Sequence, residues 1–202
     1  MPNYVFSLAH FCEIHGPSIV ICTQKSSTGT KNKASSKLQS CASCELVLPN
    51  DAVNIVSTVD EKENTFLPAT RHHRTYIQHS SKPVFGDVVS GFCMSRVFKI
   101  QDVNSRGGER KYALIMGCDE EVHLLRNWDV VTTYMGEIIS LIQRQVERNL
   151  AQEAEQSNVM DNERYLRRSK IRPKSLVELT NDTQIFVKIH LWAIDFLRDV
   201  LD

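Results

Sequence analysis

Residues 84–112, VFGDVVSGFCMSRVFKIQDVNSRGGERKY, decide how this chain folds. Between Gly91 and Ile100 the apolar side chains fall on every second residue, although Arg96 interrupts them, and this alternation is typical of a β-strand with one buried face. A polar loop with two glycines follows, and the next apolar run, Lys111 to Gly117, predicts a second strand. The stretch therefore predicts two paired strands joined by a short loop that carries Arg106.

The remaining segments add a hairpin before this pair and helices after it. Gly16–Pro17 marks the turn of the hairpin, and apolar side chains recur at helical spacing after residue 129. The expected elements are strands at 4–9, 18–23, 91–100, 111–117 and 121–125, a candidate short helix at 69–78, a long helix with Asp129 as its N-cap, and a C-terminal helix with Asn181 and Gln184 as its cap pair.

This order of elements predicts an α+β fold, in which a five-stranded antiparallel sheet is sandwiched by helices. We assign a first domain to residues 1–155, and a linker plus a C-terminal helical extension to residues 156–202. Two polar stretches, 24–40 and 152–162, have too little apolar surface to offset the entropy cost of ordering. We therefore expect both stretches to be mobile, the first as an insertion within the domain.

The composition excludes several classes of protein. The 202 residues include 24 Lys and Arg against 24 Asp and Glu, so no net charge points to nucleic acid or to an anionic membrane as a partner. Six cysteines would permit disulfides. However, the N-terminus lacks the basic region and cleavage site of a signal peptide, and no apolar run approaches the about 18–20 residues of a membrane span. We therefore expect reduced thiols in the cytoplasm, with membrane contact only through a partner.

Motifs for self-contained catalysis are absent from the sequence. None of the patterns GxxxxGKS/T, GxGxxG, HExxH or GxSxG occurs. His10, Cys12, Glu13 and His15 suggest a Cys/His nucleophile, but they flank a Gly-Pro turn and no glycine-rich loop for an oxyanion accompanies them. The sequence therefore predicts neither an enzyme in its own right nor a bound cofactor.

Cys41 and Cys44 have the Cys-x-x-Cys spacing of half a zinc site. A second Cys-x-x-Cys pair is missing, and among the nearby histidines only His73 and His79 are separated as zinc ligands are. Four ligands must converge to close a structural zinc site. We therefore expect no metal centre and keep Cys41 and Cys44 as the weaker alternative.

Several motifs resemble those of the folliculin family. Residues 10–17 read HFCEIHGP and resemble the family's HFCE-hydrophobic-HGP signature, Cys22–Thr23 follows at the expected distance, and Leu124–Trp128 leads into a long helix as in folliculin. The resemblance spans most of residues 4–155, with a compressed segment at 65–83. It implies a longin domain of the short fungal type, without the DENN-type domain that follows in longer members.

The resemblance also implies a function. The chain would be a regulatory subunit of a GTPase-activating complex that acts in trans on a Rag-type GTPase heterodimer in amino-acid and TORC1 signalling, with Arg106 as the catalytic arginine finger. It would act with a partner of the folliculin-interacting-protein type, which has longin and DENN domains. The cytoplasmic complex would be recruited to the vacuolar or lysosomal membrane.

Two alternatives remain open. Apart from the resemblance, Arg106 reads as an ordinary solvated loop arginine. The whole chain is also compatible with a non-catalytic longin adaptor in vesicle or amino-acid permease trafficking, because fold does not settle function. Arg110 lies where the next strand begins, and we expect it to be structural.

Overall fold

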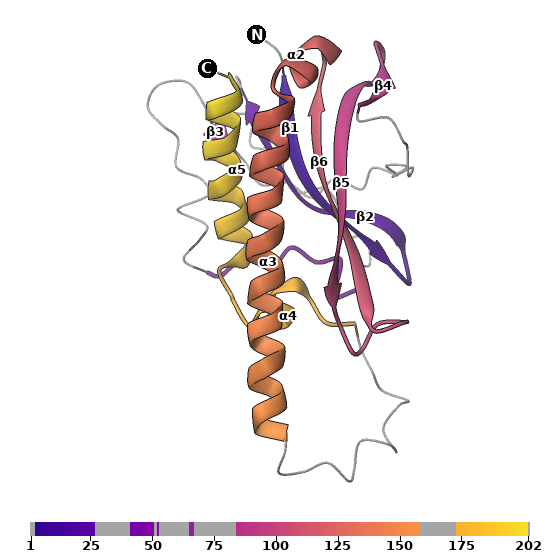
Figure 1. Ribbon diagram of the computed structural model, residues 1–202, viewed down its shortest axis with the longest axis vertical. Coiled ribbons are helices and arrows are strands. Elements are labelled where there is room, and N and C mark those ends of the chain that lie inside the picture. The colour runs from indigo at the N-terminus through magenta and orange to yellow at the C-terminus, as the bar shows by residue number, and fades with distance from the viewer. Residues whose placement is uncertain are drawn as a thin grey trace.

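The computed structural model describes residues 3–26, 41–50, 52, 65–66, 84–157 and 173–201. Its antiparallel sheet has the strand order β3-β2-β1-β6-β5-β4, so the first hairpin and the later pair of strands meet at the centre (Figure 1). The strands are β1 (Tyr4–Cys12), β2 (Gly16–Ser26), β3 (Thr65–Phe66), β4 (Phe85–Asp87), β5 (Gly91–Gln101) and β6 (Glu109–Cys118). This arrangement confirms the predicted α+β, longin-like fold, with the two-residue β3 added at one edge of five strands.

Alternation along the two central strands separates the faces of the sheet. The register places Phe6 opposite Met116 and Leu8 opposite Leu114, and all four side chains belong to the main core. The residues between them point the other way. Of these, Ile115 belongs to a smaller apolar cluster on the second face, made of Ala9, Ile19, Cys22, Ala113 and Ile115.

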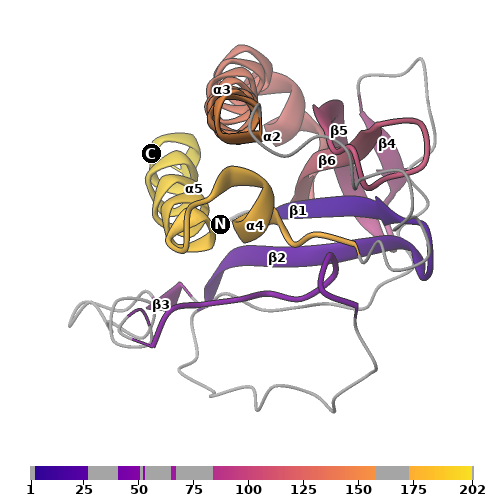
Figure 2. The same ribbon diagram turned by 90° about the horizontal axis from the view of Figure 1, so that it is seen from below.

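Helices α3, α4 and α5 lie on the face that carries the main core (Figure 2). Helix α3 forms because its buried side chains recur every three or four residues, which gives it one apolar stripe. These side chains are Val131, Met135, Ile138, Ile142 and Val146. The helices are α2 (Glu121–Arg126), α3 (Trp128–Ser157), α4 (Leu176–Thr180) and α5 (Ile185–Leu201).

An aromatic cluster joins α5 to the sheet and to α3. The ring of Phe196 lies 6.0 Å from that of Phe6 on β1, 5.0 Å from that of Tyr134 on α3 and 5.4 Å from that of Trp192. Such pairs add to the free energy gained from burying the rings. The C-terminal helix therefore packs into the main core.

The predicted strand at 121–125 is wrong, because these residues form helix α2. In a strand, Val122 and Leu124 would point to the same face. In the helix they diverge, so that Leu124 is fully buried while Val122 is 73% exposed. The fifth strand is β4 instead, which pairs with β5 through Phe85 opposite Cys93.

The predicted cap pair of the C-terminal helix is also wrong. Asn181 adopts a left-handed φ of 48° and ends α4, a conformation that asparagine tolerates. The turn into α5 is held by Asp182, whose Oδ1 accepts the Gln184 backbone N–H at 2.9 Å. Helix α4 itself begins with a capping box between Ser175 and Glu178.

Some element ends differ from those expected. Strand β2 continues to Ser26 and α3 to Ser157, so the first residues of both predicted polar stretches belong to regular elements. Helix α3 also begins at Trp128, one residue before the predicted cap, and Asp129 lies in its first turn, where its charge favours the helix dipole. The remainder of both stretches, and the candidate helix at 69–78, lie outside the described residues.

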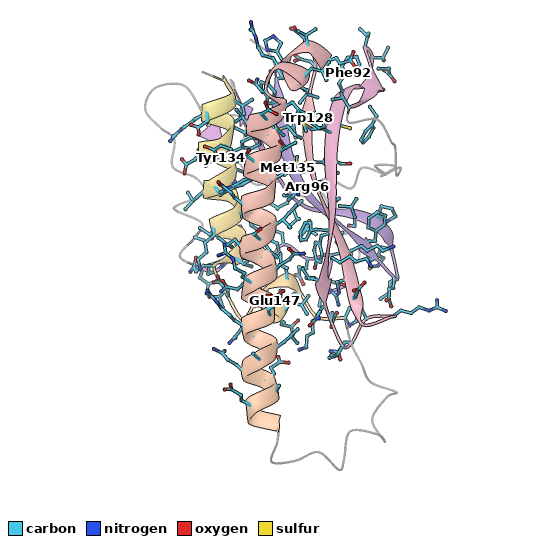
Figure 3. All side chains as sticks on the ribbon, viewed as in Figure 1. Phe92, Arg96, Trp128, Tyr134, Met135 and Glu147 are labelled. Carbon is cyan, nitrogen blue, oxygen red and sulfur yellow. The ribbon has the colours of Figure 1, made fainter. Side chains whose placement is uncertain are left out.

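Arg96 interrupts the apolar face of β5 because it meets the backbone of α3 (Figure 3). Its Nη1 donates a hydrogen bond to the Thr132 carbonyl oxygen at 3.2 Å. A Cβ atom added to Gly136 would lie 3.2 Å from the same nitrogen. A glycine at this position therefore leaves room for the guanidinium beside the helix.

Replacing Phe196 tests how far α5 supports the fold. We expect Phe196→Ala to lower the free energy of unfolding by about 3–5 kcal/mol, because it opens a cavity among the core rings. Urea unfolding monitored by circular dichroism measures the change. The control, Val89→Ala at an exposed turn, should stay within about 0.5 kcal/mol of the parent. Equal stabilities of the two variants would show that α5 is dispensable for the core.

Candidate functional site

The loop between β5 and β6, residues 102–108, is held by its own backbone. The Ser105 N–H donates to the Asp102 carbonyl at 2.9 Å, the Gly108 N–H donates to Ser105 at 3.1 Å, and the Asp102 N–H donates to Gly108 at 3.0 Å. Gly107 and Gly108 have φ of 84° and 73°, values that side chains disfavour. The loop is therefore a compact turn with a defined backbone.

A buried ion pair fixes the base of this loop. Arg110 Nη2 lies 2.5 Å from Asp102 Oδ2, and both side chains are almost completely buried. Arg110 Nη1 also donates to the Lys174 carbonyl oxygen, while Asp102 Oδ1 accepts the Asn104 backbone N–H at 3.0 Å. The cost of removing two charges from water is offset only when the pair has good geometry and its remaining polar groups are hydrogen-bonded. The contacts of Arg110 and Asp102 meet this requirement inside the protein. Arg110 is therefore a structural residue, which agrees with its expected role.

Arg106 projects from the same loop with a free side chain. The residue is exposed, and within the described part of the chain its guanidinium forms no hydrogen bond or ion pair. Its backbone N–H, by contrast, donates to Glu13 Oε1 at 2.6 Å. The backbone is thus anchored from the β1–β2 turn while the guanidinium remains available to another molecule.

A cavity of about 260 Å³ separates the loop from the β1–β2 turn. Its walls come from the end of β1, the segment around Ser43 and the first residues of the loop. His10 lines this cavity, and burial together with the charge of Arg110 lowers the pKa of its imidazole to about 4. His10 is therefore neutral near pH 7 and adds no positive charge to the wall of this cavity.

The candidate cysteines lie beside the same turn. Cys41 Sγ and Cys44 Sγ are 3.6 Å apart, which is too far for a disulfide, and Cys12 and His15 join them. Burial raises the pKa of the Cys41 thiol, but hydrogen bonds from Ser43, Cys12 and Cys44 outweigh it and lower the pKa to about 6. Burial and the neighbouring thiols raise the pKa of Cys44 to about 12. His73 and His79, weighed as ligands from sequence, lie outside the described residues.

Sequence reasoning missed two members of the site. Glu13 was considered as a neighbour of a possible nucleophile and as part of the motif at residues 10–17. In the structure it holds the Arg106 backbone, 93 residues away in sequence. Asp102 was given no role from the sequence, whereas in the structure it is the buried partner of Arg110. An aspartate and an arginine that flank a short glycine-containing loop are the one local signal that could have indicated this pair.

The fold and the loop define a longin-like domain that presents one exposed arginine from an anchored turn. Comparison with known proteins then gives the family. A family model described as "Folliculin: Vesicle coat protein involved in Golgi to plasma membrane transport" matches residues 21–200. The chain therefore belongs to the folliculin family.

Individual relatives show which members are similar in length. The chain is 28% identical over 240 residues to "Protein LST7" of Saccharomyces cerevisiae, an alignment that covers 100% of this chain and 98% of the yeast protein. It is 20% identical over 263 residues to folliculin of Rattus norvegicus and to that of Mus musculus, covering 93% of this chain and 44% of each relative. The chain thus spans less than half the length of these mammalian relatives.

The buried ion pair gives a prediction about stability. We expect Arg110→Ala to lower the free energy of unfolding by about 3–5 kcal/mol, because Asp102 would keep a buried and unpaired charge. Urea unfolding of the purified chain measures the change. Lys111→Ala, an exposed neighbour on β6, is the matched control and should change stability by less than about 0.5 kcal/mol. If Arg110→Ala were as mild as the control, the pair would not support the loop.

Proposed function

We propose that this chain supplies the arginine finger of a GTPase-activating complex for Rag-type small GTPases in amino-acid and TORC1 signalling. The observation that carries the proposal is the free guanidinium of Arg106 on a loop whose backbone is anchored by Glu13 and by the Asp102–Arg110 pair. Membership of the folliculin family and the full-length similarity to yeast LST7 support it.

The chemistry requires a cation that arrives from outside the GTPase. During hydrolysis negative charge spreads over the oxygens of the transferred phosphoryl group, and a guanidinium supplied in trans stabilises that charge. Arginine suits this role because its planar fork can donate two hydrogen bonds at once. The Arg106 guanidinium has no hydrogen bond or ion pair to give up among the described residues, so it can enter a partner's site without breaking a contact of the chain.

An anchored backbone adds to this effect. A stabilising group that is already in place does not have to be reorganised at the moment of reaction. The glycines and the internal hydrogen bonds of the loop supply this order, while Glu13 restrains the residue that bears the finger. Only the side chain of Arg106 then needs to be ordered on binding.

The complex would include a partner of the folliculin-interacting-protein type. Strand β4 is an edge strand of the described sheet, and an open edge can pair with a strand of another chain. Beside it, Asp87 Oδ1 accepts the backbone N–H groups of Val89 and Ser90, and this turn exposes Val88 and Val89 almost completely. Two exposed valines next to a free edge fit a partner that continues the sheet.

Such a complex would reach the vacuolar or lysosomal membrane through its partners. No helix in the described residues is long and apolar enough to cross a membrane. Recruitment by the GTPase heterodimer would bring Arg106 to its substrate at that surface. The cytoplasm would be the location of the chain before recruitment.

A second function has one observation in its favour. The description of the matching family model names a vesicle coat protein involved in transport from the Golgi to the plasma membrane. This description fits a non-catalytic adaptor in vesicle or permease trafficking. In an adaptor the sheet edge would bind the partner protein, and Arg106 would be dispensable. Substitution of Arg106 therefore distinguishes the two functions.

We expect Arg106→Ala to reduce stimulated GTP hydrolysis by the assembled complex roughly 10³-fold or more. The loss should appear in the chemical step, because the guanidinium acts on charge that exists in the transition state. Single-turnover hydrolysis by each candidate GTPase, at saturating complex, measures the rate. Arg106→Lys should restore little, since an ammonium lacks the planar fork.

The control for this experiment is Arg148→Ala, which removes an exposed arginine from α3. Arg110 is unsuitable because its loss is expected to unfold the base of the loop. The Arg106 and Arg148 variants should both fold and assemble as the parent does, with stability changes within about 0.5 kcal/mol. Full stimulation by Arg106→Ala would reject the finger and leave the adaptor function.

The partner gives a separate prediction. We expect the isolated chain to stimulate hydrolysis far less than the heterodimer, and Val88→Asp/Val89→Asp to weaken heterodimer formation about 10-fold or more, because each aspartate would place a charge at an apolar contact. Analytical ultracentrifugation measures assembly. Leu191→Asp, on the exposed side of α5, is the control. Equal stimulation by the isolated chain and the heterodimer would show that the partner is unnecessary.

A further inference from the structure

Four side chains from two distant segments converge beside the β1–β2 turn. Cys12 ends β1 and His15 lies in the turn that follows it. Cys41 and Cys44 lie in residues 41–50, the next described segment after β2. Their ligand atoms, three Sγ and one imidazole nitrogen, all lie within 4.8 Å of one another. The spacing is Cys-x-x-His in one segment and Cys-x-x-Cys in the other, which are common zinc-ligand spacings.

Four of the distances between these atoms are close to the edge lengths of a zinc tetrahedron. Zn–S bonds of about 2.3 Å and Zn–N bonds of about 2.0–2.1 Å place neighbouring ligand atoms about 3.5–3.8 Å apart. Cys12 Sγ lies 3.5 Å from Cys41 Sγ and 3.6 Å from His15 Nδ1. Cys44 Sγ lies 3.6 Å from Cys41 Sγ and 3.3 Å from His15 Nδ1. Disulfides would require about 2.05 Å between sulfurs.

Groups around the cluster are placed to support thiolate ligands. The Ile14 backbone N–H donates to Cys12 Sγ at 3.4 Å, the Ser43 hydroxyl lies 3.2 Å from Cys41 Sγ, and His10 Nε2 lies 3.2 Å from Cys44 Sγ. Three thiolates and a neutral histidine around Zn²⁺ carry one net negative charge. Hydrogen bonds to the sulfurs spread that charge and orient the ligands, as the outer contacts of metal sites do.

We propose that Cys12, His15, Cys41 and Cys44 bind one structural zinc ion. Four protein ligands close the tetrahedron and leave no position for water or substrate, so the ion would hold structure and perform no catalysis. The site was missed from sequence because the second pair of ligands was sought as another Cys-x-x-Cys. The second pair is instead Cys12 and His15. Each lies 29 residues before the cysteine it contacts, Cys41 and Cys44 respectively.

The position of the site gives the zinc ion a mechanical role. It would tie the β1–β2 turn to residues 41–44, and that turn also carries Glu13, which accepts the Arg106 backbone N–H. Zinc would therefore restrain the residue that anchors the loop. This consequence rests on the proposed function of Arg106, whereas binding of the metal does not.

The test is the zinc content of the full chain, purified without chelators, with its partner if the chain requires one. Mass spectrometry of the native protein and elemental analysis should give one zinc ion per chain. Cys41→Ser/Cys44→Ser should lose the metal, and His15→Ala should bind it at least about 10-fold more weakly. Cys93→Ser, which replaces a free cysteine of β5 outside the cluster, should keep one ion. One retained ion in Cys41→Ser/Cys44→Ser would overturn the proposal.

Cobalt substitution keeps the proposal testable if the ligand variants fail to fold. The parent chain, stripped of metal and titrated with Co²⁺, should show thiolate-to-cobalt charge-transfer bands and the intense visible bands of a tetrahedral site, and zinc should displace them. Absence of these bands in a folded parent would reject the site, as would a Cys41–Cys44 disulfide found by mass spectrometry under non-reducing conditions. These results do not depend on GTP hydrolysis, so the metal site and the arginine finger can fail separately.

Discussion

The antiparallel pairing of β1 with β6 is the constraint on which the rest of the structure depends. It places His10 opposite Tyr112, so the end of β1 and the start of β6 lie at the same end of the sheet. The β1–β2 turn and the β5–β6 loop are therefore neighbours although about 90 residues separate them. The hydrogen bond from the Arg106 backbone to Glu13 and the cavity lined by His10 both follow from this register.

Two arginines four residues apart lie in opposite environments at the end of the sheet. Arg110 lies within β6 and is drawn into the interior, where Asp102 neutralises it and the Lys174 carbonyl accepts a further hydrogen bond. Arg106 lies beyond the last pair of the ladder and remains in solvent. Because desolvation of a charge is costly without a partner, the buried arginine cannot leave its contacts, whereas the exposed one is free to bind.

The same end of the sheet also collects the residues that restrain the loop. Glu13, in the β1–β2 turn, accepts a hydrogen bond from the loop, and the proposed zinc ion would bind Cys12 and His15 of the same turn. An adaptor would have no need for such restraint around a solvated arginine, because its affinity would come from the sheet edge. The supporting contacts around Arg106 are therefore the structural support for the proposed finger.

The sequence by itself determined the strands β1, β2, β5 and β6, the helices α3 and α5 and the exposed position of Arg106, because alternation, helical periodicity and glycine-containing turns are local properties. It misassigned 121–125, where Val122 and Leu124 fit both a strand and a helix until burial distinguishes them. It also missed the pairing of Asp102 with Arg110 and of Cys12 and His15 with Cys41 and Cys44. Only the tertiary structure decided these, because the register of β1 on β6 and the return of residues 41–44 to the turn are contacts between segments that are distant in the chain.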